Sequence, residues 1–314
     1  MTRTDRADAG PRSAAGSPPG SLTRGNPTSG NPTPVRPTGG TQTGSNPAGG
    51  NVTAGNPTGG GAHVLDNPVM ASLRAAHAHL AEVNGRAARY PADVFLAAAL
   101  ADASDPRAWA DLAALAGTTG RSLLVGDPPA PPPDWKVAMR ADGVQLIGAG
   151  VEPVADSEAV VLGTADVPEM LDLVARTEPG PFAARTIALG TYLGIRRGGA
   201  LIAMAGERLH PPGWTEISAV CTDPAYRGQG LASRLIRAVA LGIWARGETP
   251  FLHAAATNTS AIRLYEALGF TIRRPVTFAL LESADADADA DAGAAAGDDA
   301  GVGGGPAPAG PRHG

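Results

Sequence analysis

The spacing of apolar residues predicts a helix-rich segment over residues 63–150. Five apolar residues recur there at steps of three and four: Val69, Leu73, Ala76, Leu80 and Val83. This spacing forms one face of a helix, and Asn67-Pro68 just before it is a typical helix start. Asp105-Pro106 predicts a second helix, which ends at Gly117. Residues 122–125 form a short apolar run.

A hairpin is predicted near the end of this segment, after the Pro-rich residues 128–133. Residues 137–140 and 144–147 have the composition of strands. The pair Asp142-Gly143 between them favours a tight turn. We therefore expect these two short strands to pair with each other.

Beyond residue 150 the pattern changes to strands that alternate with helices. Strands are predicted at residues 160–162, 191–196, 200–205, 216–222, 251–255 and 276–281. Helices are predicted to begin at Asp166-Val167, Leu231 and Ser260, since caps or apolar periodicity start at each. An antiparallel hairpin followed by strand–helix alternation predicts an α/β or α+β fold, with a mixed, mostly antiparallel sheet flanked by helices.

Composition separates the two ends of the chain from this ordered part. Residues 1–62 are rich in Gly, Pro, Asn and Thr, and residues 282–314 are rich in Ala, Asp and Gly. Segments with so little to bury cannot offset the entropy of ordering. We therefore expect two disordered tails; the alternative that we favour less is a binding role for the N-terminal one.

Charge and cysteine content exclude several classes of protein. The formal net charge is −5, whereas a nucleic-acid-binding domain normally shows a basic face. A single cysteine, Cys221, rules out an internal disulfide. No apolar run approaches the ~18 residues of a membrane-spanning helix, and the N-terminus lacks the apolar core of a signal peptide. We expect a cytoplasmic monomer or homodimer that binds neither nucleic acid nor membranes, and no metal site.

The strongest chemical signal is the stretch from Glu216 to Ser233. A strand there runs into the loop Arg227-Gly228-Gln229-Gly230, which opens directly onto a helix. Glycines let successive backbone N–H groups converge, and a helix N-terminus carries roughly half a positive charge. This pattern predicts a cradle for a pyrophosphate. The loop lacks the glycine spacing of dinucleotide sites and the Gly-Lys-Ser/Thr of nucleoside-triphosphate sites.

Two motifs together resemble the GNAT superfamily of N-acetyltransferases. Arg227-x-x-Gly230-x-Ala232 is similar to its pyrophosphate-binding signature. The residues from Asn258 to Phe270, which include Leu264-Tyr265-Glu266, resemble its second signature. The resemblance is firm over residues 194–281 and implies a GNAT domain over 151–281. Residues 63–150 resemble the degenerate N-terminal half of the glycine-N-acyltransferase-like branch.

The resemblance implies acetyl-CoA as co-substrate and a primary amine as acceptor. Glu216 matches a position used as general base, and Tyr265 one whose hydroxyl protonates the leaving thiolate. The implied cofactor-binding residues are Val220, Cys221, Thr222, Arg227, Gly228, Gln229, Gly230, Leu231, Ala232, Ser233, Asn258 and Tyr265. Transfer would then occur by direct attack of the amine on the thioester.

Each of these roles has a plainer alternative. Glu216 could be a salt-bridged residue at a strand start, Tyr265 could pack on the core, and Asn258 could be only a helix cap. Strand alternation places Cys221 on the face opposite Glu216, which favours a small buried residue over a nucleophile. For the whole protein, the rival is a non-catalytic acyl-CoA-binding sensor or scaffold. Candidates for the rim of the acceptor pocket are Phe182, Tyr192 and residues 210–214.

Overall fold

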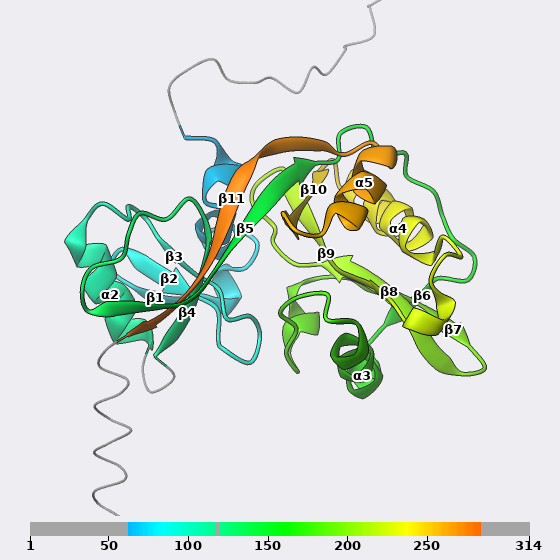
Figure 1. Ribbon diagram of the computed structural model, residues 1–314, viewed down its shortest axis with the longest axis horizontal. Helices are drawn as coiled ribbons and strands as arrows, with labels where there is room; N and C mark the ends of the chain where they lie inside the picture. The colour runs from blue at the N-terminus through cyan, green and yellow to red at the C-terminus, as the bar shows by residue number, and fades with distance from the viewer. Residues whose placement is uncertain (1–61, 117–119, 284–314) are drawn as a thin grey trace, which may run out of the picture. The chain divides into compact units, whose positions relative to one another are not determined.

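The computed structural model describes residues 62–116 and 120–283 of the chain (Figure 1). The predicted tails, 1–62 and 282–314, lie almost entirely outside these residues. Of the tails, the structure describes only Ala62 and the last two residues of the final strand. No helix within the described ranges is both long and apolar enough to cross a membrane.

The segment before residue 120 contains both helices and a small sheet. Its helices are α1 (Pro68–Leu73) and α2 (Pro106–Ala116). Its strands β1 (Glu82–Asn84), β2 (Ala87–Arg89) and β3 (Ala98–Leu100) form an antiparallel sheet in that order. Helix α2 lies where it was predicted, and its buried face packs on β2 and β3 together with strands of the main sheet.

The helix predicted to continue to Val83 instead ends at Leu73, and this prediction is wrong. The chain turns after Arg74, and the imidazole of His77 enters the core, where it contacts Tyr90 and the carbonyl of Leu189. Two hydrogen bonds to distant parts of the chain satisfy this ring, which a continuing surface helix would not allow. Tertiary contacts therefore override the helical spacing.

The main sheet has eight strands in the order β4-β11-β5-β10-β9-β8-β7-β6. All neighbours in it are antiparallel except β9 and β10. Its strands are β4 (Arg121–Gly126), β5 (Trp135–Ile147), β6 (Val160–Leu162), β7 (Tyr192–Arg197), β8 (Ala200–Glu207), β9 (Trp214–Thr222), β10 (Thr249–Ala255) and β11 (Thr271–Ser283). The predicted mixed, mostly antiparallel sheet is confirmed.

Strand β5 runs without a break through the predicted turn at Asp142-Gly143, so the hairpin prediction is wrong. Its 13 residues lie between β10 and β11, and in Figure 1 β5 and β11 form one long twisted ribbon. Gly143 serves close packing here, because a Cβ at this position would overlap the ring of Phe278. The sheet therefore inserts a strand from before residue 150 between two strands from the C-terminal part of the chain.

Helices cover both faces of the C-terminal part of the sheet. On one face α4 (Leu231–Ala245) packs on β7, β8 and β9, with α5 (Thr259–Ala267) beside the same core. On the other face lies α3 (Val167–Thr177), whose Met170 and Leu173 are fully buried. Figure 1 shows α3 and α4 on opposite sides of these strands.

Strands β9 and β10 pair only at their beginnings. Their register covers Trp214–Glu216 against Thr249–Phe251, and beyond this point the two strands part. In β9, Ala219 has a φ of 51°, and both Ala219 and Val220 lie opposite the single residue Ala205 of β8. This is a β-bulge, which adds a residue and bends the strand.

The bulge changes which side chains share a face of β9. Ser218 lies opposite Gly206 and Cys221 opposite Met204, and Gly206 and Met204 are on the same face of β8. Cys221 therefore shares a face with Ser218 and Glu216, and the prediction that it points the opposite way is wrong. A regular alternation of two cannot account for an inserted residue.

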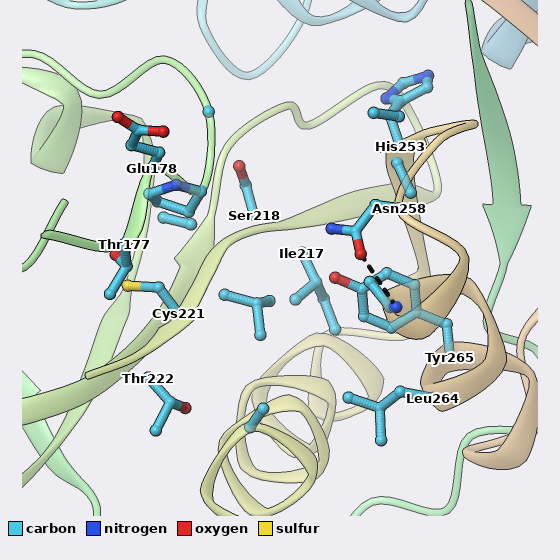
Figure 2. Close-up of a pocket in the computed structure, with 18 of the residues that line it drawn as sticks. Thr177, Glu178, Ile217, Ser218, Cys221, Thr222, His253, Asn258, Leu264 and Tyr265 are labelled. Atoms are coloured by element: carbon cyan, nitrogen blue, oxygen red, sulfur yellow. Dashed lines mark hydrogen bonds between the residues drawn. The ribbon is translucent and has the colours of Figure 1, made fainter. Parts of the chain in front are cut away.

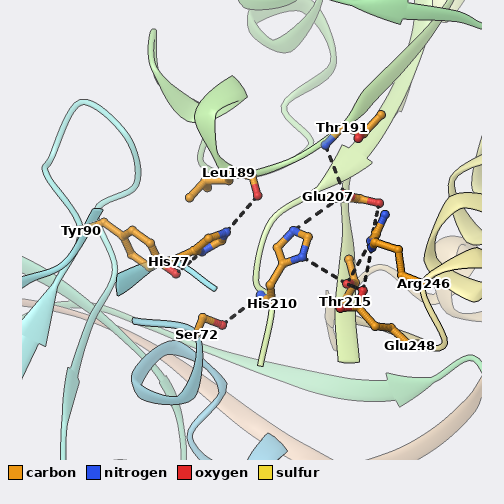
Figure 3. A network of polar contacts seen from close by, with 10 residues as sticks. All are labelled: Ser72, His77, Tyr90, Leu189, Thr191, Glu207, His210, Thr215, Arg246 and Glu248. Atoms are coloured by element: carbon orange, nitrogen blue, oxygen red, sulfur yellow. Dashed lines mark hydrogen bonds and ion pairs between the residues drawn. The ribbon is translucent and has the colours of Figure 1, made fainter. Parts of the chain in front are cut away.

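A buried polar network joins the N-terminal segment to the sheet (Figure 3). The hydroxyl of Ser72 accepts from the backbone N–H of His210 at 3.0 Å, and the His77 and His210 rings lie 4.9 Å apart. Because a carbonyl can only accept, Nε2 of His77 donates to Leu189 at 3.0 Å, and Nδ1 accepts from the Tyr90 hydroxyl at 2.8 Å. His77 is thus held neutral, with both nitrogens satisfied.

We expect the protein to lose stability in mild acid because of His77. Burial lowers the pKa of His77 from 6.5 to about 4. The neutral ring therefore stabilises the folded state fully above pH 6.5. The contribution disappears as the pH falls from 6.5 to 4, because only the unfolded chain takes up the proton in that range. We expect a decrease of up to roughly 3 kcal/mol in the unfolding free energy, as the size of the shift implies. Urea titrations of the wild type and His77→Gln between pH 7.5 and 4.5 should show a flatter profile for the variant; equal slopes would contradict the assignment.

Candidate active site

A cavity of about 900 Å³ lies where β9 and β10 part (Figure 2). Residues 217–222 of β9 form one side of it, and residues 253–255 of β10 form the other. Since β9 beyond Glu216 has no partner on the β10 side, backbone groups of this stretch are left free to bind an extended ligand. The cavity thus offers a hydrogen-bonding strand edge inside the fold.

One end of the cavity is the glycine loop between β9 and α4. Gly230 is the N-cap of α4 with a φ of 73°, a conformation that favours glycine. No side chain caps this 15-residue helix, so its first N–H groups are available to an anion. A Cβ built on Gly228 or Gly230 would meet no heavy atom within 4 Å, which shows that the loop faces open space. The guanidinium of Arg227 adds a positive charge at the same end.

The residues around this loop fit a bound pyrophosphate and pantetheine arm. Eleven of the predicted cofactor-binding residues line the cavity: Val220, Cys221, Thr222, Arg227, Gly228, Gly230, Leu231, Ala232, Ser233, Asn258 and Tyr265. The side-chain oxygen of Thr222 is buried without a hydrogen-bond partner among the described residues. Gln229 is the one predicted member that does not line the cavity.

Helix α5 brings Asn258 and Tyr265 to the opposite wall. Asn258 caps the helix, because its side-chain oxygen accepts from the N–H of Ala261 at 3.2 Å. Tyr265, two turns further on, packs its ring on Phe270. Burial raises the pKa of the Tyr265 phenol to about 12. The phenol therefore stays protonated over the physiological range and can act as a proton donor.

Glu216 lies next to the cavity but does not line it. Its side chain is completely buried and accepts from Arg208 at 2.7 and 2.9 Å and from Nδ1 of His253 at 2.7 Å. Burial alone would raise the carboxyl pKa, but the opposite charge and the hydrogen bonds of Arg208 outweigh it and hold the pKa at about 2. Such a carboxylate is a very weak base and is well suited to fix its two neighbours in place.

His253 and Arg208 line the cavity, and both owe their orientation to this network. Nε2 of His253 lies 3.0 Å from the side-chain nitrogen of Gln145, whose oxygen accepts from Arg273 at 2.8 Å. The Gln145 nitrogen is therefore the donor, and Nε2 of His253 the acceptor. The guanidinium of Arg208 lies 4.9 Å from the centre of the Phe95 ring, within range of a cation–π contact.

The other end of the cavity is mostly apolar and comes largely from outside the predicted GNAT domain. Its wall is made of Phe95, Leu123, Val125, Met139, Ala141 and Phe278. All of these except Phe278 precede residue 150. The N-terminal segment thus builds the side of the cavity that faces away from the glycine loop.

Several acceptor-side residues could not be identified from the sequence. Arg208, His253 and the wall residues carry no motif, and they meet only through the insertion of β5 and the docking of the N-terminal segment. The candidates named instead do not line the cavity. Tyr192 is 1% exposed with Phe182 packed on it, and the residues from His210 to Trp214 lie elsewhere in the fold.

A cavity between parting strands, with a glycine loop at a helix N-terminus and a half-buried tyrosine, is the arrangement that the resemblance to acyl-CoA-dependent transferases leads us to expect. A sequence model of the FR47-like protein family matches residues 192–278. A crystal structure of a putative GNAT acetyltransferase from Novosphingobium aromaticivorans is 46% identical, with a TM-score of 0.66 over 71% of this chain and 99% of that one. The chain belongs to the GNAT family and is an N-acetyltransferase, with acetyl-CoA as acyl donor.

Two curated proteins are also similar in sequence. N-alpha-acetyltransferase RimI of Mycobacterium tuberculosis is 36% identical over 130 residues, which cover 37% of this chain and 81% of that protein. The uncharacterized protein ML0378 of Mycobacterium leprae is 34% identical over 154 residues, 44% of this chain and 42% of that protein. The division at residue 150 and the glycine-N-acyltransferase-like branch stay predictions.

Proposed function

We propose that this protein transfers the acetyl group of acetyl-CoA to a primary amine by direct attack within a ternary complex. The observation that carries the proposal is the single continuous cavity. It joins the glycine loop at one end to the acceptor chamber at the other and has Tyr265 in its wall. A donor and an acceptor entering from opposite ends would meet beside β9, so no covalent acyl-enzyme is needed.

Bound acetyl-CoA would supply the activated acetyl group, and the chain would hold and polarise it. Arg227, Gly230 and the first N–H groups of α4 would bind the pyrophosphate, and the free backbone edge at Val220 and Thr222 the pantetheine arm. An N–H of that edge would stabilise the negative charge that develops on the thioester oxygen. The amine would release its ammonium proton to solvent before the attack. The Tyr265 hydroxyl would protonate the leaving thiolate, and the proton that the attacking nitrogen then loses would return to the phenolate through water.

We propose a supporting role for Glu216 in place of the general base suggested by the motif. Its carboxylate is fully engaged by Arg208 and His253, with a pKa near 2, and it does not line the cavity. It would therefore position these two side chains against the acceptor. Cys221 would not act as a nucleophile, because burial raises the pKa of its thiol to about 11.

The proposal is tested by CoA-thiol release with acetyl-CoA and a panel of amines. The panel should include amino acids, polyamines, aminoglycosides and peptides with free N-termini; the peptides are motivated by the similarity to an N-alpha-acetyltransferase. We expect turnover that depends on a primary amine. Tight acetyl-CoA binding without turnover on any acceptor would instead support a non-catalytic acyl-CoA sensor.

Gly230→Glu should weaken acetyl-CoA binding by at least tenfold. The substitution places a negative charge at a helix N-terminus that is proposed to hold a pyrophosphate, and it forces a side chain into a φ of 73°. Isothermal titration with acetyl-CoA measures the effect.

Gly198→Glu is the matched control for Gly230→Glu. It imposes the same side chain at a φ of 57° in the β7–β8 turn, which does not line the cavity, so its acetyl-CoA affinity should equal that of the wild type. Normal acetyl-CoA affinity in Gly230→Glu would overturn the assignment of the glycine loop.

A further inference from the structure

Glu178 is the only carboxylate among the described residues that line the cavity. It follows α3 directly, and the residues 177–181 around it also line the cavity. Figure 2 shows Glu178 on the side of the cavity away from Tyr265, with Ser218 between them in the view. The cavity thus contains one acidic group, at its exposed rim, whose role neither the fold nor the motifs explain.

The backbone at Glu178 is unfavourable in three respects. Its φ of 47° and ψ of 54° lie in the left-handed region, where glycine or asparagine normally ends a helix. It also precedes Pro179, which favours extended backbone for the residue before it. An acidic side chain at the C-terminus of a helix opposes the helix dipole as well. Unfavourable backbone conformations and residue choices of this kind cluster at functional sites, where they are kept because binding or catalysis requires them.

The Glu178 carboxylate has no hydrogen bond or ion pair with any described residue. The nearest cation along the chain, Arg176, is already engaged by Asp172 at 3.1 Å and by Asp223 at 3.1 Å. The interactions of the folded chain therefore do not account for an acid at this position. An exposed carboxylate without a partner at the rim of a substrate cavity is suited to a cationic ligand.

The rest of the cavity restricts what that ligand can be. The charge of Arg208 is balanced by Glu216 in a buried pair, and Arg227 lies at the glycine loop. The chamber on the acceptor side is otherwise lined by apolar groups such as Phe95, Met139 and Phe278. This combination of one negative group and an apolar wall is complementary to a protonated amine on an apolar chain.

We propose that Glu178 is the ammonium-binding group for the acyl acceptor, which is a primary amine carried on an apolar body. The carboxylate would capture the acceptor at the rim by its positive charge. The apolar wall would hold the acceptor's body and lower the amine pKa as the nitrogen moves inward. This inference rests on the proposed function, because it names the substrate class of the same site.

The variant Glu178→Gln tests whether the negative charge of Glu178 is needed to bind the acceptor. The cation butyltrimethylammonium tests ammonium binding separately from acetyl transfer. This quaternary cation cannot be acetylated, and it should inhibit the wild type competitively against the amine acceptor. In Glu178→Gln we expect its inhibition constant and the KM for the amine each to rise about tenfold, with the Kd for acetyl-CoA unchanged. Glu152→Gln, which alters an exposed acid outside the cavity, is the matched control and should behave as wild type.

Glu178→Gly separates function from backbone strain. Glycine accepts the left-handed conformation, so its Tm should rise by about 2–4 °C, while its KM for the amine should rise as in Glu178→Gln. An unchanged amine KM and unchanged cation inhibition in Glu178→Gln would overturn the proposal, even with a normally active wild type. If the wild type acetylated no amine, the proposed function would fail by itself, and direct calorimetric titration of the cation into both proteins would still decide the role of Glu178.

Discussion

Replacing Tyr265 by phenylalanine should lower kcat by about a hundredfold or more, in line with the usual contribution of a positioned proton donor. The phenol lies in the wall between the glycine loop and the acceptor chamber, and burial keeps it protonated up to a pKa of about 12. Its removal leaves the thiolate without a donor, whereas the ring contact with Phe270 persists. Steady-state kinetics with the best amine of the panel measure the effect.

Two controls make the Tyr265 result specific. The Kd for acetyl-CoA and the Tm should stay close to wild type, because the hydroxyl makes no hydrogen bond to a described residue. Tyr226→Phe removes a second phenol from the cavity lining, beside the glycine loop, and it should retain most of the activity. A fully active Tyr265→Phe would rule out the assignment of this residue as the acid.

Arg208→Met should destabilise the protein by about 3–5 kcal/mol, the usual cost of removing one partner of a buried ion pair. The Glu216 carboxylate is completely buried, and Arg208 supplies two of its hydrogen bonds. Without Arg208 this carboxylate must remain buried with His253 as its only partner or take up a proton. Chemical denaturation at pH 7.5 measures the loss.

The double variant Arg208→Met/Glu216→Leu is the decisive comparison. Removing both charges should recover much of the stability lost in the single variant, because no uncompensated charge is left in the core. Arg176→Met, which breaks surface pairs with Asp172 and Asp223, should cost about 1 kcal/mol or less. A loss of similar size in Arg208→Met and Arg176→Met would contradict the description of Glu216 as a buried charge that depends on Arg208.

The same ion pair sets the behaviour of the wild type in strong acid. Because the folded state lowers the pKa of Glu216 from 4.5 to about 2, its stabilising contribution is complete above pH 4.5. That contribution is lost as the pH falls toward 2, since the unfolded chain binds the proton first. This range begins near the lower end of the His77 range, so as the pH falls His77 weakens the fold first and Glu216 follows.

The matched family region and most of the apolar wall of the cavity occupy different parts of the chain. The FR47-like match covers residues 192–278, which hold the glycine loop and Tyr265. The apolar wall comes largely from residues before 150, and Glu178 also lies outside the match. Under the proposed function, we therefore expect changes before residue 192 to alter the choice of acceptor more than the binding of acetyl-CoA.

The sequence by itself determined the donor side of this protein. A glycine loop between a strand and a helix, and a cap and tyrosine two turns apart on another helix, are local features. The glycine loop predicts an anion cradle from its local pattern, and the resemblance to the two GNAT signatures then assigns Arg227, Gly230 and Asn258 to acetyl-CoA binding. The order and type of the elements beyond residue 150 followed in the same way from apolar periodicity.

Only the tertiary structure decided the acceptor side. The pairing of Glu216 with Arg208 and His253 depends on contacts between separate strands, and the bulge at Ala219 reversed the expected orientation of Cys221. The uninterrupted strand β5 depends on long pairing with β11, which outweighs the local turn preference of Asp142-Gly143. Burial and pairing between distant segments are collective properties of the fold, and no short stretch of sequence encodes them.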